Sequence, residues 1–181
     1  MSGEECYRRF LDGDKSGFNE IIHIYHDGLI YFLYGITKNY DDAEDAAADA
    51  FVELLVHKHR YSFRSSLKSY LYSTGRHKAI DIIRRRSKQC GEPDEEIPSD
   101  LPSPEESVIN DDEKRLLRDA MRCISKDYRE ALHLVYFEDM SIAESAKVMG
   151  KSKKQTENCL YRGKQALRVI LENKNYVGHT E

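Results

Sequence analysis

The sequence predicts an all-α protein made of two small helical domains joined by a flexible linker. Apolar residues recur at helical spacing in both halves of the 181-residue chain, and no segment shows the two-residue alternation of a β-strand. All four prolines lie between residues 93 and 104, where they disfavour helix. We therefore place the first domain at residues 1–88, the linker at 89–106 and the second domain at 107–181.

Three apolar patterns predict the helices of the first domain. The second predicted helix covers residues 41–55, with Asp41 as its N-cap and Glu44 as the capping-box partner, and the third covers about 66–87. The first carries a single apolar stripe at helical spacing. Its members are Phe18, Ile21, Ile22, Tyr25, Leu29, Phe32, Leu33 and Ile36.

The second domain is predicted to contain four helices, of which the first covers roughly 106–124. Gly150 suits the left-handed residue that ends the third, and the third and fourth together form a helix-turn-helix unit. The last three helices each open on a capping-box pair. These pairs are Asp127 with Glu130, Ser141 with Glu144, and Ser152 with Gln155.

Charge is distributed unevenly along the chain. The formal net charge is −4, yet residues 89–112 hold nine acidic and no basic side chains, while residues 113–181 carry a net +4. Phosphates respond to local charge, so the two ends remain suited to nucleic acid. The acidic, proline-containing strip favours an extended linker.

The sequence does not support membrane insertion, secretion or metal-dependent catalysis. No apolar run approaches the ~20 residues of a membrane span, and the N-terminus lacks the order of a signal peptide, so we expect a cytoplasmic protein without membrane insertion. Four scattered cysteines, including Cys90 in a polar stretch, show no zinc-ligand spacing. The rival hypothesis of a metal-dependent hydrolase fails because neither histidine pair has a third ligand at suitable spacing. These pairs are His23 with His26 and His57 with His59. We expect no metal, no cofactor and no active site.

The last helix, about 153–171, has a face suited to DNA bases. Its apolar face includes Thr156, Leu160 and Gly163, and Lys164 and Arg168 flank the opposite face. Asn, Gln and Arg side chains pair with base edges in the major groove, and flanking cations contact phosphates. The opposite face holds polar residues without acids, although a solvated helix surface would look similar. These residues are Lys154, Asn158, Tyr161, Arg162 and Gln165.

Residues 60–88 combine positive charge with aromatic rings. This segment holds nine Lys or Arg residues and a single acid, Asp81. Aromatic platforms in a positive groove bind unpaired bases, at about 1–3 kcal/mol for each stacked base. For Phe63 and Tyr70 a place in the core is the alternative interpretation. One end of the chain therefore suits duplex DNA and the other suits opened strands.

These residues together resemble the small extracytoplasmic-function sigma factors of bacterial RNA polymerase. Ala43-Glu44-Asp45 with Asp49 and Phe51 is similar to region 2.2 of that family. The stretch from Phe63-Arg64 to Arg84-Arg85 resembles regions 2.3 and 2.4. Arg129-Glu130-Ala131-Leu132 and Leu160-Tyr161-Arg162 resemble region 4. The chain departs from the family at Tyr70, Ala48, His77 and residues 154–159, which affects the expected promoter sequence rather than the class.

The resemblance implies three sets of site residues. Lys153, Lys154, Gln155, Asn158, Tyr161, Arg162 and Gln165 would contact the −35 element. Tyr61, Phe63, Arg64, Lys68, Tyr72, Arg76, His77, Lys78, Arg84 and Arg85 would hold the melted −10 element. Asp42, Asp45, Asp49 and Glu53 would bind the clamp of the polymerase β′ subunit.

The implied partners are core RNA polymerase, through its β′ clamp and β flap, and promoter DNA, with an anti-sigma factor as a further candidate. The free protein is expected to be a monomer. The acidic linker would run towards the active-site channel of the polymerase and imitate nucleic-acid charge. The alternative function is that of a stand-alone helix-turn-helix transcriptional regulator, which would have no need of the basic segment 60–88.

Overall fold

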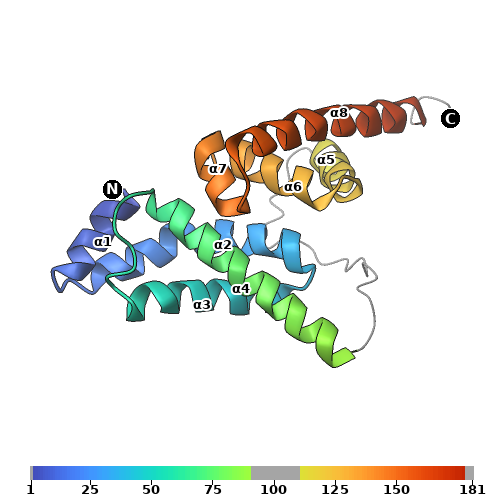
Figure 1. Ribbon diagram of the computed structural model, residues 1–181. Coiled ribbons are helices and arrows are strands. Elements are labelled where there is room, and N and C mark those ends of the chain that lie inside the picture. The colour runs from blue at the N-terminus through green and yellow to red at the C-terminus, as the bar shows by residue number, and fades with distance from the viewer. Residues whose placement is uncertain (1, 91–110, 178–181) are drawn as a thin grey trace.

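The computed structural model describes residues 2–90 and 111–177, and within them every regular element is helical, which confirms the predicted fold class (Figure 1). The predicted linker lies outside the described residues from position 91 onwards. The helices of the first domain are α1 (Gly3–Leu11), α2 (Ser16–Thr37), α3 (Tyr40–Val56) and α4 (Leu67–Cys90).

The core of the first domain forms where α2, α3 and α4 pack against one another. Leu29 and Leu33 of α2 are fully buried, as the apolar stripe predicted. α3 contributes four buried alanines, whose small side chains allow the helices to approach closely; they are Ala43, Ala46, Ala47 and Ala50. Each fully buried Leu contributes about 1.5–3 kcal/mol, so the burial of Leu29 and Leu33 stabilises the domain.

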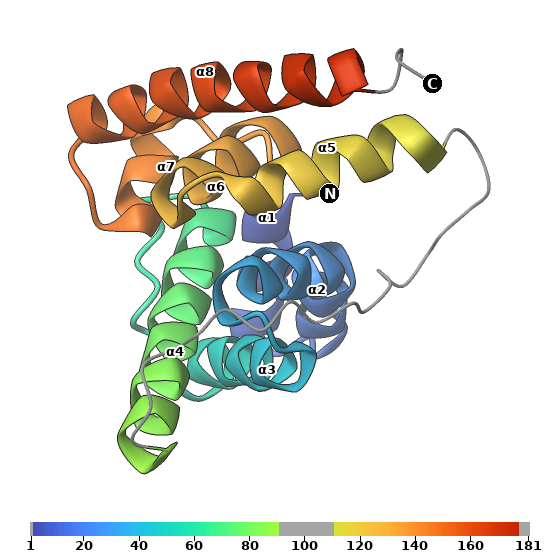
Figure 2. The same ribbon diagram turned by 90° about the vertical axis from the view of Figure 1, so that its right-hand side faces the viewer.

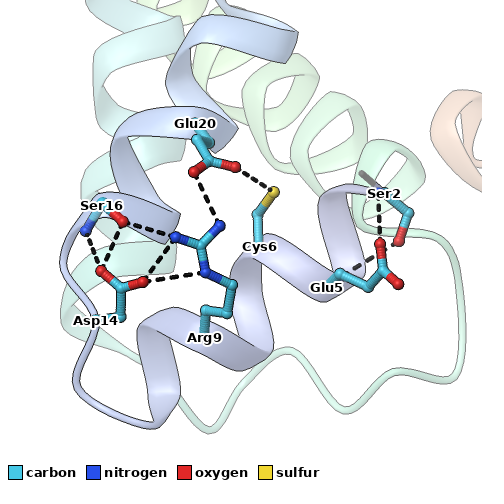
Figure 3. Close-up of polar contacts among 7 residues, drawn as sticks. All are labelled: Ser2, Glu5, Cys6, Arg9, Asp14, Ser16 and Glu20. Carbon is cyan, nitrogen blue, oxygen red and sulfur yellow. Dashed lines mark hydrogen bonds and ion pairs between the residues drawn. The ribbon is translucent and has the colours of Figure 1, made fainter.

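Helix α1 was not predicted, and a polar cluster fastens it to the start of α2 (Figure 3). The Arg9 guanidinium pairs with Asp14 at 2.7 Å and with Glu20 at 2.9 Å, and the Cys6 thiol donates to Glu20. The two helices come so close at Gly17 that a Cβ there would lie 2.3 Å from the Cys6 carbonyl oxygen. Only glycine fits at this contact.

Two of the predicted helix starts are wrong. The N-cap of α3 is Asn39, two residues before the predicted Asp41, because Asn39 is extended and its side chain accepts the backbone N–H of Asp42. α6 (Lys126–Leu132) follows Ser125, and its predicted Asp127–Glu130 capping box is absent. The Glu130 carboxylate instead accepts a hydrogen bond from Arg76 of the other domain.

The remaining helices of the second domain are α5 (Asp111–Cys123), the π-helical turn η1 (His133–Phe137), α7 (Ile142–Met149) and α8 (Lys153–Val177). The Ser141–Glu144 capping box at α7 is confirmed. Ser152 and Gln155 exchange the corresponding hydrogen bonds at α8. Gly150 ends α7 in the left-handed conformation, with φ of 63°, as predicted.

The two domains lie directly against each other. α7 packs on α4, and α6 packs on α2. α8 lies on the side of the second domain that faces away from the first (Figures 1 and 2). None of the helices within the described ranges combines the length and hydropathy of a membrane span.

Candidate nucleic-acid interface

Helix α8 presents its polar face to solvent. Thr156, Leu160 and Gly163 are buried against the rest of the domain. All seven residues predicted to contact the −35 element are exposed, with Tyr161 at 67%. The periodicity of the sequence therefore divides this helix into a packing face and an open face.

The packing of α8 fixes the direction of that open face. Gly163 approaches α6 so closely that a Cβ would lie 3.1 Å from side-chain atoms of both Leu132 and Tyr128. At the other end, Ser152 and Gln155 fix the first turn of the helix. α8 is therefore anchored at its start and along its buried side, while its first three turns stay accessible.

The basic helix α4 has two rows of candidate residues that face different surroundings. His77, Arg84 and Arg85 are exposed, and Arg84 forms only a loose 3.7 Å pair with Asp81. Residues 68, 72 and 76 follow one another at intervals of four and form a second row. This second row faces the second domain, and acidic groups already contact it.

The contacts of this second row are short. Lys68 lies 2.8 Å from the Glu138 carboxylate, and the Tyr72 hydroxyl donates to the same group at 2.7 Å. Arg76 donates to Glu130 at 2.8 Å. Burial raises the pKa of Glu138, but hydrogen bonds from His133, Lys68 and Tyr72 outweigh it and lower that pKa to about 2. Burial beside Glu138 raises the pKa of Tyr72, so its hydroxyl stays protonated and donates.

The segment before α4 holds the other aromatic candidates. Tyr61 is buried and its hydroxyl donates to the Ser65 carbonyl, so its ring packs in the domain rather than facing solvent. Phe63 is 38% exposed, with the Arg8 guanidinium 5.1 Å from its ring centre. Its backbone has φ of 59°, which is unfavourable for a side chain of this size. Arg64 is exposed beside it.

The acidic candidates of α3 fall into two groups. Asp42 pairs with Arg86 at 2.6 Å, and Glu53 pairs with Arg60 and with Lys78 at 3.5 Å. Burial raises the pKa of Glu53, but these neighbouring cations outweigh it and lower the pKa. Both side chains thus stabilise the domain from within. Asp45 and Asp49 are exposed and remain available to a partner.

Sequence reasoning missed an apolar extension of this exposed stripe. Val52 is 52% exposed and Val56 is 63% exposed, and both follow Asp45 and Asp49 at helical spacing on α3. The periodicity could have shown them, because they fall on the outer side of a helix whose inner side holds Ala46, Ala50 and Leu54. Exposed apolar side chains rimmed by polar ones are a feature of protein-binding surfaces.

The two histidine pairs considered as metal ligands do not form a metal site. His57 and His59 are exposed, and His26 lies 2.8 Å from Asp27. In the described ranges, no group of three or more His, Cys, Asp or Glu side chains is placed to bind a metal ion.

Two family models match the two domains. Sigma-70 region 2 matches residues 21–89, and Sigma-70, region 4, matches residues 114–167. Among curated relatives, the ECF RNA polymerase sigma factor SigM of Bacillus subtilis is 29% identical over 84% of this chain and 93% of its own length. SigW of the same organism is 23% identical, over 89% of this chain and 92% of the relative.

The fold also matches solved structures. One is the sigma factor RpoE in complex with the anti-sigma factor NepR from Bartonella quintana, with a TM-score of 0.73 and 21% identity over 86% of this chain and 96% of that chain. Another is CnrH in complex with the cytosolic domain of CnrY, with a TM-score of 0.68 and 17% identity over 96% of this chain and 99% of the other. These likenesses extend across both domains.

Proposed function

Because the chain belongs to the extracytoplasmic-function group of the sigma-70 family of RNA polymerase sigma factors, we propose that it selects promoters through two separate DNA contacts. The family consists of initiation factors that are not themselves catalysts. In this proposal α8 contacts the −35 element in the major groove, and residues 60–88 hold the opened −10 element.

The open face of α8 carries the proposal. Its seven polar side chains are exposed on one helix that follows a capped helix and a glycine turn, as in the helix-turn-helix units that enter the major groove. Arg162, Asn158 and Gln165 have the hydrogen-bonding groups that distinguish bases, whereas Lys153 and Lys154 suit phosphates at the helix start.

The −10 contact uses the exposed residues around α4. Phe63 and Arg64 provide an aromatic ring beside a cation, and His77, Arg84 and Arg85 extend the positive surface along the helix. Stacking and phosphate contacts of this kind bind single strands. Tyr61 supports this surface from within the core, because its ring is buried.

The stripe on α3 is the proposed site for the β′ clamp. Asp45 and Asp49 would provide charge and Val52 and Val56 apolar area. We expect Asp49→Lys to weaken binding to core polymerase at least tenfold, measured by fluorescence anisotropy, with unchanged helicity. Asp12→Lys, which makes the same charge change at an exposed position after α1, is the matched control. Equal affinities for both variants would contradict the clamp assignment.

Run-off transcription with purified core polymerase tests the whole proposal. The template is the DNA upstream of the protein's own gene, with start sites mapped and footprints recorded. We expect a discrete transcript that requires the protein, with protection near −35 and −10. Co-elution with core polymerase but no transcript would mean that a different template is needed. The absence of both a transcript and co-elution would favour the stand-alone regulator.

That alternative gives no role to the first domain, of which residues 21–89 match region 2. The proposed role of the acidic linker falls on residues outside those that the structure describes, apart from its first two, which end α4. An anti-sigma partner stays a prediction. Co-purification with the products of neighbouring genes would identify one.

A further inference from the structure

Helix α1 lies alongside a loop that carries part of the proposed −10 surface (Figure 1). The loop covers residues 57–66 and connects α3 to α4. It runs past α1 in the opposite direction, from Lys58 beside Phe10 to the start of α4 beside Glu4. Sigma-70 region 2 matches the chain from residue 21 onwards, so α1 precedes that match and only its contacts indicate what it does.

Glu4 and Tyr7 of α1 fasten the two ends of this loop. Leu67 is the first residue of α4, where backbone N–H groups have no partner within the helix, and its amide donates to the Glu4 carboxylate at 2.8 Å. At the other end, the buried Tyr7 hydroxyl donates to the Lys58 carbonyl at 2.9 Å. The path of the loop therefore depends on α1.

The Phe63 ring is held firmly within this loop although it is 38% exposed. Its centre lies 4.8 Å from the centre of the Tyr61 ring and 6.0 Å from that of the Tyr7 ring. Its backbone φ of 59° is unfavourable and persists only where the surrounding contacts enforce it. A partly exposed ring that its neighbours hold in one position is suited to stack on an unpaired base.

Arg8 of α1 places a cation beside this ring. Its guanidinium carbon lies 5.1 Å from the centre of the Phe63 ring, and Arg8 follows Glu4 by one helical turn. Arg8 is exposed, and within the described ranges no acidic side chain forms an ion pair with it. Its charge is therefore available to a ligand that contacts the ring.

We propose that Arg8 is a further DNA-contacting residue of the −10 surface, and that Glu4 and Tyr7 are positioning residues for the loop. The proposal rests on the proposed function of residues 60–88 and deepens it. An unpaired base stacks on Phe63, and the guanidinium beside the ring binds the phosphate of that nucleotide. The surface for single-stranded DNA thus begins on α1.

Salt titration of the full-length protein with a fluorescent 15-nucleotide single-stranded DNA of mixed sequence tests the contact. We expect Arg8→Ala to weaken binding at least threefold at low salt and to lower the slope of log affinity against log salt by about 0.7, since one phosphate contact to a single strand is lost. Arg8→Lys keeps the charge and should keep the slope. Lys126→Ala is the matched control, because it removes an exposed cation at the start of α6 in the other domain. Equal slopes for Arg8→Ala and Lys126→Ala would overturn the proposal.

A double-mutant cycle determines whether Arg8 and Phe63 bind the same nucleotide. We expect Phe63→Ala to weaken binding at least fivefold, as for the loss of one stacked base. The loss in the double variant should be smaller than the product of the two single losses, because the two side chains share one ligand. Losses that simply multiply would mean separate sites and would overturn the proposal. If Phe63→Ala also binds like wild type, the −10 assignment of the loop fails too, which is a different result from the failure of Arg8 alone.

Variants of Glu4 separate positioning from direct contact. Glu4→Ala and Glu4→Gln remove the same charge, but only the glutamine keeps an acceptor oxygen for the Leu67 amide. We expect Glu4→Ala to show faster hydrogen exchange at that amide and at least twofold weaker DNA binding than Glu4→Gln, with the same salt slope. Equal exchange and equal affinity in the two variants would overturn the positioning role of Glu4.

Discussion

The two surfaces that we propose for DNA on this sigma factor differ in how the fold presents them. On α8 the candidate residues point into solvent, whereas on α4 one row of candidates is exposed and another is bonded to carboxylates. Both surfaces carry polar and basic side chains at helical spacing. Their sequences alone give no reason to expect one to be open and the other half covered.

The difference shows that the accessibility of each helix face depends on whether the other domain packs against it. α8 lies on the far side of the second domain, and among the described residues its polar face is exposed. α4 belongs to the first domain, and its first turns pack against the second, so the row there meets Glu130 and Glu138. A basic helix thus identifies a surface for phosphates but does not show when that surface is available.

The substitution Gly163→Leu should have the largest effect, because Gly163 is where α8 packs on α6 and so fixes the direction of its polar face. A leucine there would clash with Leu132 and Tyr128, and we expect a loss of about 1–3 kcal/mol in the stability of the second domain. Faster hydrogen exchange across α6 and α8, with unchanged exchange in α2 and α3, would show it. Gly35→Leu is the control, because nothing lies within 4 Å of a Cβ at that position. Equal exchange in both variants would mean that α8 tolerates displacement.

Removing a base contact should have the next largest effect. We expect Arg162→Ala to weaken holoenzyme binding to promoter DNA by about 1–3 kcal/mol and to relax base choice at one −35 position. Competition between duplexes that differ at single positions measures both quantities. A uniform loss over all sequences would instead identify Arg162 as a phosphate contact.

The helical fold was largely predictable because packing follows apolar periodicity. The stripe from Phe18 to Ile36, the Ser141 and Ser152 caps and the turn at Gly150 all depend on neighbours within one or two turns. The orientation of α8 followed for the same reason. Local rules are sufficient where a residue's partners are close in sequence.

Apart from the N-cap of α3 and the unpredicted α1, what spacing could not show depends on partners that are distant in sequence. Glu130 fits a capping box by spacing, but a cation 54 positions earlier in the sequence, Arg76, takes it instead. Asp42 and Glu53 share a helix with Asp45 and Asp49, yet cations from elsewhere in the domain pair with them. Tyr61 is aromatic in a basic segment and nevertheless buried. Spacing reveals a helix face but not what the fold places against it.

The stability of the contact between Glu138 and the second row of α4 should depend on pH. Its pKa in the folded protein is about 2, below its ordinary value of 4.5, so its contribution to stability is complete above pH 4.5 and declines as the pH falls towards 2. The groups that face it are Lys68 and Tyr72 on α4 and His133 on η1.

The midpoint of thermal unfolding at pH 6 and at pH 3.5 measures this contribution. We expect wild type to melt above Glu138→Gln at pH 6, with a smaller gap at pH 3.5, where the unfolded chain is largely protonated at this position. Asp139→Asn changes the exposed neighbouring acid and should leave the midpoint near wild type at both pH values. A gap for Glu138→Gln that is independent of pH would mean that packing, rather than charge, stabilises the contact.

The smallest effect should come from the exposed row of α4. Arg85→Ala removes an exposed cation, so we expect no change in stability and a uniform weakening of −10 binding. The slope of log affinity against log salt should fall by about 0.7, since one phosphate contact to a single strand is lost. Salt titration with a fluorescent 15-nucleotide single-stranded DNA of mixed sequence measures the slope. An unchanged slope would show that Arg85 does not contact phosphate.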